Sequence, residues 1–381
     1  MRLDRHRPDF IILIVTLILV SIGLINVYSA SIIWSYQNLG NSPSFFFKRQ
    51  CIWSGLGLVV MFASMNIPFW FWKRLAKPLL LGSFAMLPLV FFFTPVNGAR
   101  RWIDLGPLSI QPSELAIFAV IVYLSYLLTK KQDILDDFKK GVLPSVVIAS
   151  ICGSLVLIEP DMGTAVLLVV SAYGVMFSSG IPFRHLTKLL IGAVILSIVF
   201  IVLESYRMER MLAFLNPWKY QDDQSYQLIN SLYAISSGGW TGRGLGQSIE
   251  KFLYLPEPHT DFIFAILTEE WGIIGAVTVI ALFAILVWRG TIIAARIPDR
   301  FGSLLACGIT TMIGFSVIVN IGMVTGIMPV IGIPLPFISY GGSSLLIKLI
   351  SMGVLLNVSR YTVENPSRPL TIQTRHMTTN I

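Results

Sequence analysis

Long apolar segments separated by short polar connections follow one another from residue 10 to about residue 361. A helix needs about 20 residues to cross a hydrocarbon core of about 30 Å, and most of these segments approach or exceed that length. Lipid offers no hydrogen-bond partners, so each segment must satisfy its own backbone, and the alternating segments of a β-barrel are absent. The pattern predicts an all-α polytopic membrane protein of about ten helices, near residues 10–30, 50–67, 75–94, 112–129, 142–158, 162–179, 187–205, 262–288, 303–327 and 340–361.

Composition agrees with this pattern, since 55% of the residues are hydrophobic and 13% are charged. The charged share is roughly half that of an ordinary soluble domain. The first apolar segment follows Arg2, Arg5 and Arg7 as in a signal peptide, but it is too long for a typical signal sequence, so we interpret it as an uncleaved span. We expect residues 1–361 to form a single transmembrane domain and residues 362–381 to form a polar cytoplasmic tail.

The distribution of Lys and Arg predicts the orientation, because positive residues near span ends resist translocation. With the N-terminus inside, 18 of the 28 Lys and Arg residues lie on the cytoplasmic side and nine on the outer side, while Lys348 lies within the last span. Both termini are therefore predicted to be cytoplasmic. Residues 206–260, between the seventh and eighth spans, form the one long extracytoplasmic loop. The net charge of +8 is then mainly a topology signal, and nucleic acid is not implied.

Other residue types exclude several kinds of site. The three cysteines are far apart and inside predicted spans, which argues against a disulfide framework or a thiolate metal site. The four histidines form no metal-spaced pair, and the chain has no Gly-rich nucleotide loop and no nucleophile elbow. These patterns indicate no protein-built metal site and no organic cofactor.

Carboxylates gather at the predicted outer ends of the spans. An ionisable group within the hydrocarbon costs about 2.5–3.5 kcal/mol on insertion scales, so its presence usually has a reason. Glu114 opens the fourth span, and Asp161 ends a tight turn between the fifth and sixth spans. Capping of a helix start explains both residues as well as a role in binding does.

Asp261 stands directly before the eighth span, at the end of the run Tyr254-Leu-Pro-Glu-Pro-His-Thr-Asp261. Two prolines, a histidine and two acids make this a stiff and polar approach to the membrane surface. Partial desolvation there would raise the pKa of the Asp261 carboxyl, which suits a general base near neutral pH. A plain helix cap is the alternative.

The 206–260 connection is polar but rich in glycine and aromatic residues. Glycines at 238, 239, 242, 244 and 246 would permit close backbone approach to a ligand, or would only make a flexible surface loop. The aromatic side chains suit either an interfacial belt or stacking on sugar rings, and they are Trp218, Tyr220, Tyr226, Trp240 and Tyr254.

Two further outer segments are unusual. Residues 97–107 place Arg100 and Arg101 on the outer side, where bidentate guanidinium groups suit a lipid pyrophosphate or, equally, lipid headgroups. Residues 326–342 are apolar and rich in Gly and Pro, which predicts a re-entrant segment buried against protein.

Together these motifs resemble the SEDS family, the shape, elongation, division and sporulation proteins that include FtsW, RodA and SpoVE. Eight motifs occur in order over nearly the whole chain: Gly98-Ala-Arg-Arg-Trp-Ile103, Gln111-Pro-Ser-Glu114, Glu159-Pro-Asp-Met-Gly-Thr164, Phe214-Leu-Asn-Pro-Trp218, Ser225-Tyr-Gln-Leu228, Tyr254 to Ala265, Glu269-Glu270 and Leu335 to Ser344. The resemblance implies a peptidoglycan glycosyltransferase of the bacterial plasma membrane. Such an enzyme polymerises lipid II into glycan strands during division, elongation or sporulation and pairs with a class B penicillin-binding protein.

The resemblance also implies roles for residues. The essential acid of the family falls on Asp261, the carboxylate of its Gln-Pro-Ser-Glu motif on Glu114, and its loop tryptophan on Trp102. We expect an arginine to hold the pyrophosphate, with a divalent cation such as Mg²⁺ as a further aid. The arginine candidates are Arg100, Arg101 and Arg210, and the remaining substrate-binding candidates are Asp161, Tyr226, Gln227, His259 and Ser339.

One departure from the family concerns the partner of Glu114. Family members commonly have a lysine three residues after this glutamate, where the chain has Ile117. Lys348, in the last span, is a candidate to supply that charge from another helix. The branch stays open, because Asn216-Pro-Trp218 and the run from Leu245 to Tyr254 look like FtsW and SpoVE, whereas residues 328–337 look like RodA.

Two other functions compete with glycan polymerisation. A lipid II flippase should place ionisable groups near the membrane midplane and often has repeat symmetry, whereas these acids gather at the outer rim and no internal repeat is evident. A non-catalytic scaffold of the cell-wall synthesis machinery predicts that loss of the Asp261 carboxylate leaves all biochemical activity intact.

Overall fold

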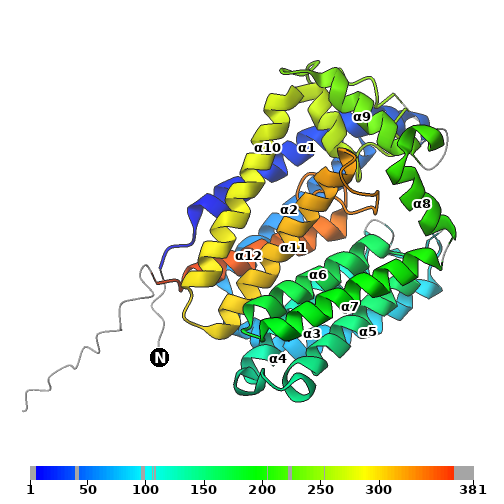
Figure 1. Cartoon of the computed structure of the whole chain (residues 1–381). Coiled ribbons are helices and arrows are strands. Elements are labelled where there is room, and N and C mark those ends of the chain that lie inside the picture. Colours follow the sequence, from blue (N-terminus) through cyan, green and yellow to red (C-terminus); the bar gives the residue numbers. More distant parts are fainter. Residues whose placement is uncertain are drawn as a thin grey trace, which may run out of the picture.

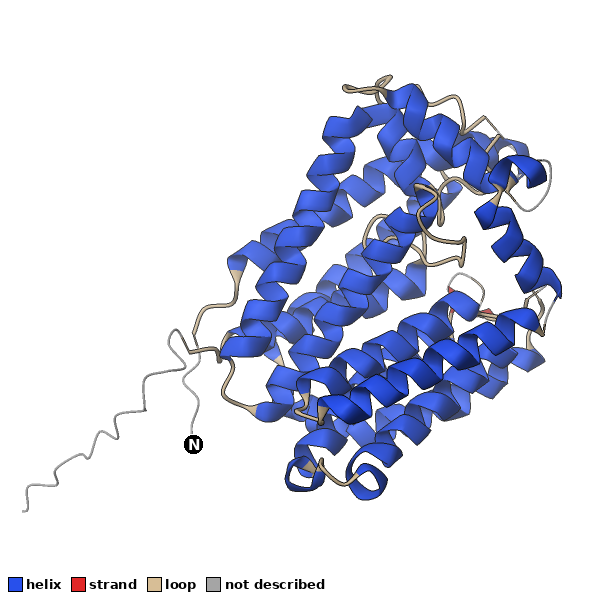
Figure 2. Cartoon of the chain, in the orientation of Figure 1, coloured by secondary structure: helices blue, strands red, loops and turns tan. Residues whose placement is uncertain are grey.

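The computed structural model describes residues 6–38, 43–95, 99–104, 106, 109–203, 205–221, 225–252 and 254–363. Helices dominate these residues, as Figures 1 and 2 show. All ten predicted spans are present as α1 (Phe10–Asn38), α2 (Phe45–Asn66), α3 (Phe69–Leu89), α4 (Pro112–Lys130), α5 (Leu143–Ile158), α6 (Met162–Ser178), α7 (Phe183–Val202), α10 (Ile263–Arg296), α11 (Arg300–Val324) and α12 (Gly342–Ser359). In the part of the chain that is described, nine helices are long and apolar enough to cross a membrane, and α6 is a shorter apolar helix of 17 residues.

The long connection between α7 and α10 contains two helices that the hydrophobic pattern did not predict. They are α8 (Ser205–Leu215) and α9 (Tyr226–Gly238), with a short 3₁₀ turn, η4 (Pro217–Tyr220), between them. Figure 1 shows α9 packed against one end of α10, while α8 connects α9 to the end of α7. We call this part of the bundle the α9 end.

The short elements lie in the connections between helices. Strands β1 (Ile103–Asp104) and β2 (Ser109–Ile110) pair antiparallel just before α4. Single turns of 3₁₀ helix follow α3 and α4, namely η1 (Val90–Phe92) and η2 (Gln132–Ile134), and a π-helical turn, η3 (Phe138–Val142), precedes α5.

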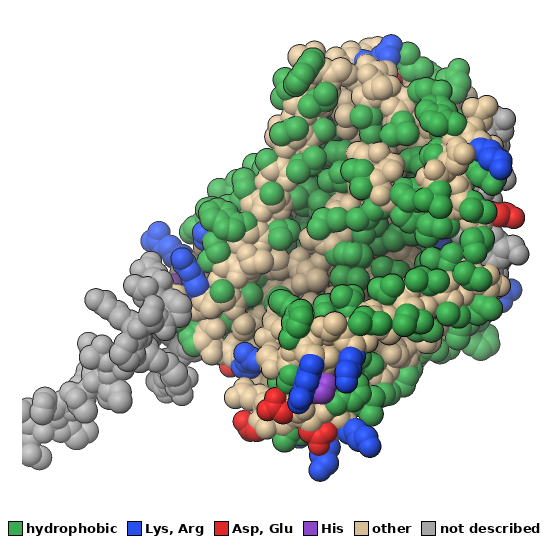
Figure 3. Space-filling view, in the orientation of Figure 1, with side chains coloured by type: hydrophobic (Ala, Val, Ile, Leu, Met, Phe, Trp, Pro, Cys, Tyr) green, Lys and Arg blue, Asp and Glu red, His purple; other side chains and the backbone are tan. Residues whose placement is uncertain are grey.

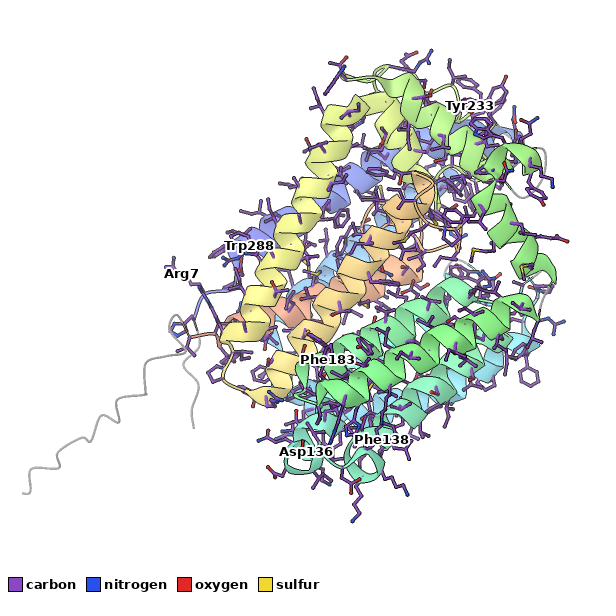
Figure 4. The ribbon with its side chains drawn as sticks, in the orientation of Figure 1. Arg7, Asp136, Phe138, Phe183, Tyr233 and Trp288 are labelled. Atoms are coloured by element: carbon purple, nitrogen blue, oxygen red, sulfur yellow. The ribbon has the colours of Figure 1, made fainter. Side chains whose placement is uncertain are left out.

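The described ends of the chain meet at the end of the bundle opposite α9. The His6 amide donates to the Arg360 carbonyl (2.7 Å), and the Asp9 amide donates to the Ser359 hydroxyl (3.0 Å). Figure 4 shows Arg7 and Asp136 far from Tyr233, which lies on α9. Figure 3 shows apolar side chains along the helices and charged side chains gathered toward this opposite end. The first and last described residues therefore lie on one side of the apolar bundle.

The interior is built around α12, most of whose residues are buried. A Cβ atom on Gly353 would lie only 2.3 Å from the Met61 carbonyl oxygen, so this glycine allows α12 to pack closely against α2. In contrast, only Leu186 is buried in α7, the most exposed of the long helices. Apolar side chains cover α7, as suits a surface that faces lipid.

The Gly-rich part of the connection packs against a kink in α10. At Gly272 the backbone has φ 70°, and a Cβ on Gly242 would lie 2.1 Å from the Glu270 carbonyl oxygen. The Arg243 and Gly244 amides donate to the Glu269 and Glu270 carbonyls, both at 3.0 Å. The glycines of this segment predicted a close approach of its backbone to another group. At Gly242 the backbone closely approaches α10.

The segment between α11 and α12 is apolar and non-helical, as the sequence predicted. Its side chains at Ile333, Leu335, Phe337 and Ile338 are almost completely buried. Burial against protein allows backbone that is not helical to exist within an apolar bundle. This segment forms one wall of the site described next.

Candidate functional site

A cavity of about 600 Å³ lies where the first residues of α6 and α10 meet α8 and the segment before α12. Its volume is within the range of sites for small molecules. Figure 3 shows the surface hollowed in this region, between α11 and the pair α6 and α7. The charged residues that line the cavity are Arg101, Asp161, Arg210, Glu257 and Asp261.

Asp261 is fixed at the cavity by its backbone. Its carbonyl accepts from the Asn320 side-chain amide of α11 (2.8 Å), which also donates to the Ile333 carbonyl (2.7 Å). A Cβ on Gly332 would lie 3.3 Å from an oxygen of the Asp261 carboxylate, so the glycine leaves room for this group. The backbone of Asp261 is therefore held in place by a hydrogen bond while its side chain lines the cavity.

The surroundings favour the protonated form of Asp261 more than water would. Burial raises the pKa of Asp261 to about 6, and the neighbouring Asp161 and Glu257 carboxylates act in the same direction. Arg101 and Arg210 oppose this rise in the pKa. A carboxylate with a pKa of about 6 is ionised at pH 7 and is a stronger base than an ordinary aspartate, in agreement with the sequence-based expectation.

Asp161 caps α6 and also lines the cavity. One carboxylate oxygen accepts from the Thr164 amide (3.1 Å), and the other accepts from the Thr164 hydroxyl (2.8 Å) and the Gln111 side-chain amide (2.7 Å). Burial raises the pKa of this carboxyl as well. The two explanations offered by the sequence, a cap and a site residue, are thus compatible at this position.

Two of the three arginine candidates reach the cavity. Arg101 donates from Nε to the Glu159 carbonyl (3.3 Å) and from its terminal nitrogen to the Pro160 carbonyl, which places it beside Asp161. Arg210 of α8 donates to the Val330 carbonyl (3.4 Å) on the facing wall. Arg100 points elsewhere, to the Phe91 carbonyl (2.8 Å), and does not line the cavity.

Glu114 lies behind the cavity wall, in a buried ion pair with Lys348. The Lys348 ammonium is 3.0 and 3.2 Å from the two carboxylate oxygens and also donates to the Ser344 hydroxyl, which leaves both charged side chains almost inaccessible. Lys348 of α12 therefore supplies the charge that Ile117 cannot provide.

His259 and Ser339 were expected to bind substrate, but both lie outside the cavity. His259 is 2% exposed and packs against the rings of Trp34, Phe46 and Tyr340. Burial lowers the pKa of His259 to about 4, so its ring is neutral at pH 7. The Ser339 hydroxyl accepts from the Leu335 amide (2.8 Å) and so closes a turn. Both side chains therefore take part in local packing and turn structure and do not line the cavity.

The aromatic candidates also lie outside the cavity, although Gln227 lines it. Tyr226, Trp218, Trp240 and Tyr254 are exposed on the surface, and Trp102 is half-buried near β1. Consecutive residues on a helix point in directions about 100° apart, which separates Tyr226 from Gln227. Stacking of these aromatic rings on a sugar inside this cavity is not supported.

Two cavity residues had not been singled out from the sequence as site residues. Glu257 and Thr260 belong to the turn that precedes α10, and both line the cavity with Asp261. The sequence shows prolines and acidic residues in this run, but the pattern does not encode the geometry of the turn that they form. The other wall residues are mainly apolar, and include Met162, Met211 and Ile331.

Comparison with known proteins agrees with this architecture. A family described as "Cell cycle protein", of the FtsW, RodA and SpoVE type, matches residues 9–364. Stage V sporulation protein E of Bacillus subtilis (strain 168) is 44% identical over 366 residues, which cover 95% of this chain and 99% of that protein. "Probable peptidoglycan glycosyltransferase FtsW" of Geobacter sp. (strain M18) is 40% identical over 354 residues, which cover 92% and 96% of the two chains.

Solved structures show the same fold. A chain from a peptidoglycan synthase complex, studied for its coordination of polymerization and crosslinking, aligns with a TM-score of 0.74 at 30% identity and covers 93% of this chain and 98% of that chain. Thermus thermophilus RodA aligns with a TM-score of 0.69 at 29% identity, again over 93% and 98% of the two chains. The chain therefore belongs to the SEDS family of FtsW, RodA and SpoVE proteins and is a multi-pass integral membrane protein with a RodA-like, all-α fold.

Proposed function

We propose that this protein is a peptidoglycan glycosyltransferase that polymerises lipid II into β-1,4 glycan strands on the outer face of the bacterial plasma membrane. Relatives that carry this enzyme name match nearly the whole chain. The single observation that carries the proposal is the placement of Asp261 in one cavity with Arg101 and Arg210. The reaction calls for a base on the acceptor hydroxyl and for positive charge near the departing pyrophosphate.

The reaction inverts the anomeric centre, because an α-linked pyrophosphate donor becomes a β-1,4 glycosidic bond. Asp261 removes the proton from the 4-hydroxyl of the acceptor N-acetylglucosamine. The oxygen then forms a bond to the anomeric carbon of the donor while the bond to pyrophosphate breaks. Arg101 and Arg210 stabilise the negative charge that develops on the departing pyrophosphate.

A divalent cation such as Mg²⁺ belongs to this proposal only as a partner of the pyrophosphate. Among the described residues, no group of three His, Cys, Asp or Glu side chains is placed to hold a metal ion. Mg²⁺ is commonly held by one or two carboxylates together with phosphates, so the substrate would supply most of its ligands. Such an ion would share the stabilisation of charge on the pyrophosphate with Arg101 and Arg210 of the cavity wall.

The proposed orientation places the α9 end outside the cell and both termini in the cytoplasm. The shared position of the described chain ends supports this orientation, as does the excess of Lys and Arg in the connections at that end. In this scheme residues 1–361 form the transmembrane domain and residues 206–260 are extracytoplasmic. The cytoplasmic tail, residues 362–381, lies almost entirely outside the described residues.

We further propose a class B penicillin-binding protein as the partner, a transpeptidase that would cross-link the strands. A relative of the same fold comes from a peptidoglycan synthase complex that coordinates polymerization and crosslinking. The process served, whether division, elongation or sporulation, would be determined by which partner the chain binds.

The decisive experiment is polymerisation of purified lipid II by the purified protein, alone and with its transpeptidase. We expect Asp261→Asn to reduce the rate by about 10²–10⁴-fold, because the substitution removes the general base while keeping the shape of the side chain. Asp133→Asn, at an exposed acid of the opposite end, is the control and should retain full activity. Unchanged polymerisation by Asp261→Asn would contradict the assignment. Transbilayer movement of lipid II by the wild type without any polymer would favour a flippase.

A further inference from the structure

The turn before α10 holds an acidic residue in a conformation that glycine would adopt more easily. Glu257 has φ 44°, and its carbonyl accepts from both the Thr260 amide (3.0 Å) and the Thr260 hydroxyl (2.8 Å). Positive φ is uncommon for residues other than glycine, and such strained residues concentrate at functional sites. The chain nevertheless has a glutamate here, which suggests that the side chain is needed.

This turn places Glu257 in the cavity wall that Asp261 also lines. Residues 256, 257, 260 and 261 all line the cavity, so the turn presents its polar side chains to the same space. Glu257 is half-buried, and water therefore screens its charge less than at an open surface.

The charged groups that act on Asp261 come from four elements. Asp161 stands at the start of α6, Arg101 stands before β1, Arg210 is on α8, and Glu257 is in the turn itself. His259 faces away into its aromatic surroundings and is neutral at pH 7. The Asp161 oxygens accept from Gln111 and Thr164, so this acid also caps α6.

We propose that Glu257 is a positioning residue that acts through Asp261: its strained turn places a further negative charge, in addition to that of Asp161, in the cavity wall that Asp261 lines. A neighbouring like charge disfavours the ionised form of Asp261 and so makes it a stronger base. A stronger base takes the proton of a sugar hydroxyl more readily. This inference rests on the proposed glycosyltransferase function, in which Asp261 is that base.

The test is the pH profile of kcat/KM for lipid II polymerisation, which reports the pKa values of the free enzyme. In the wild type, activity should fall as the pH drops through about 6, where Asp261 becomes protonated. We expect Glu257→Gln to move this acidic limb down by about half a pH unit and to lower the plateau by at most about threefold, because the neutral amide no longer opposes ionisation of Asp261 and the weaker base takes the proton less readily. The control Glu250→Gln removes an acid of the same connection outside the cavity and should leave the limb in place.

Two further variants separate charge from backbone strain. Glu257→Gly removes the carboxylate and also relieves the positive φ, so it should fold even if Glu257→Gln does not, and its limb should move in the same direction. Glu257→Asp keeps the charge and should keep the limb close to its wild-type position. A plateau that falls while the limb stays fixed in the Gln and Gly variants would mean a purely structural role and would overturn the inference.

The failure of this inference can be told apart from the failure of the proposed function. If Asp261→Asn is inactive and the limb of Glu257→Gln does not move, only the role of Glu257 is wrong. If Asp261→Asn polymerises lipid II normally, the general-base function itself is wrong.

Discussion

Two sets of carboxylates stand near the start of α10, and their surroundings differ. Asp261 faces a cavity, whereas Glu269 and Glu270, deeper in the helix, are sealed within the protein. Glu269 accepts from the Ser248 hydroxyl (2.6 Å) and the Ile249 amide (2.7 Å). Glu270 pairs with Lys251 (2.9 Å), and the Ser29 hydroxyl of α1 donates to it (2.6 Å).

The contrast separates acids that maintain structure from an acid that is available to react. The sealed acids join the 242–252 segment to α10 and α1, and their donors leave no space for a substrate. The Asp261 side chain instead borders about 600 Å³ of open volume. The pair Glu114–Lys348 belongs with the sealed acids, although the sequence had marked Glu114 as a substrate-binding candidate.

The largest effect on stability is expected from breaking a sealed pair. Lys348→Met should lower the free energy of unfolding by about 3–5 kcal/mol, because it leaves the Glu114 carboxylate buried without its cation. The double variant with Glu114→Gln should recover much of this loss, since no charge is then left buried. Unfolding midpoints in detergent provide the measurement.

Asp261→Asn is the matched comparison for that prediction. It also neutralises an acid, but one whose ionised form is disfavoured in the folded protein, so it should raise the unfolding midpoint at neutral pH. A Lys348→Met variant with full stability and activity would erase the distinction between the sealed and the open acids.

A smaller effect is expected where the glycines meet α10. Gly242 and Gly246 have nearly the same φ, 80° and 78°, but only Gly242 has an atom within reach of an added Cβ, the Glu270 carbonyl at 2.1 Å. Gly242→Ala should therefore destabilise the protein by about 1–3 kcal/mol more than Gly246→Ala does. Thermal unfolding of the two variants measures the difference, and equal losses would show that only the positive φ matters.

The sequence predicted those parts of the fold that a hydrophobic pattern encodes directly. Apolar length encodes membrane spans, and all ten were found, with α1 extending to Asn38 where the pattern predicted an end near residue 30. Helices α8 and α9 were missed because they are short and lie within a polar connection, where no membrane-length apolar run marks them.

Only part of the site was predicted from the sequence. A motif gives the position of a residue along the chain but not the direction in which its side chain points. Asp261, Asp161, Arg101, Arg210 and Gln227 all reach the cavity. Arg100 and Tyr226, each adjacent to one of these residues, point elsewhere, because neighbouring side chains leave the backbone in different directions. Only packing against other helices decides which neighbour enters the cavity.

The smallest and sharpest contrast lies between His259 and Asp261, which should respond to acid in opposite ways. Burial lowers the pKa of His259 from 6.5 to about 4, so between these values the unfolded chain binds a proton that the folded chain does not. Protonation of His259 in the unfolded chain therefore lowers the free energy of unfolding as the pH falls through this range. Burial raises the pKa of Asp261 from 3.8 to about 6, so between these values the folded chain holds the extra proton, and stability is gained as the pH falls.

These opposing contributions can be separated by removing one group at a time. Each changes the free energy of unfolding by at most about 1.4 kcal/mol per pH unit, and in the wild type they largely cancel between pH 6 and 4. Relative to the wild type, His259→Phe should gain stability on acidification and Asp261→Asn should lose it, as measured by unfolding midpoints at a series of pH values. Other titrating groups, such as Glu159 with its pKa raised to about 8, are common to both variants and drop out of their difference. If acidification changed the stability of both variants in the same direction relative to the wild type, the prediction would be wrong. The surroundings of His259 and Asp261 would then not shift the stability of the protein in opposite directions.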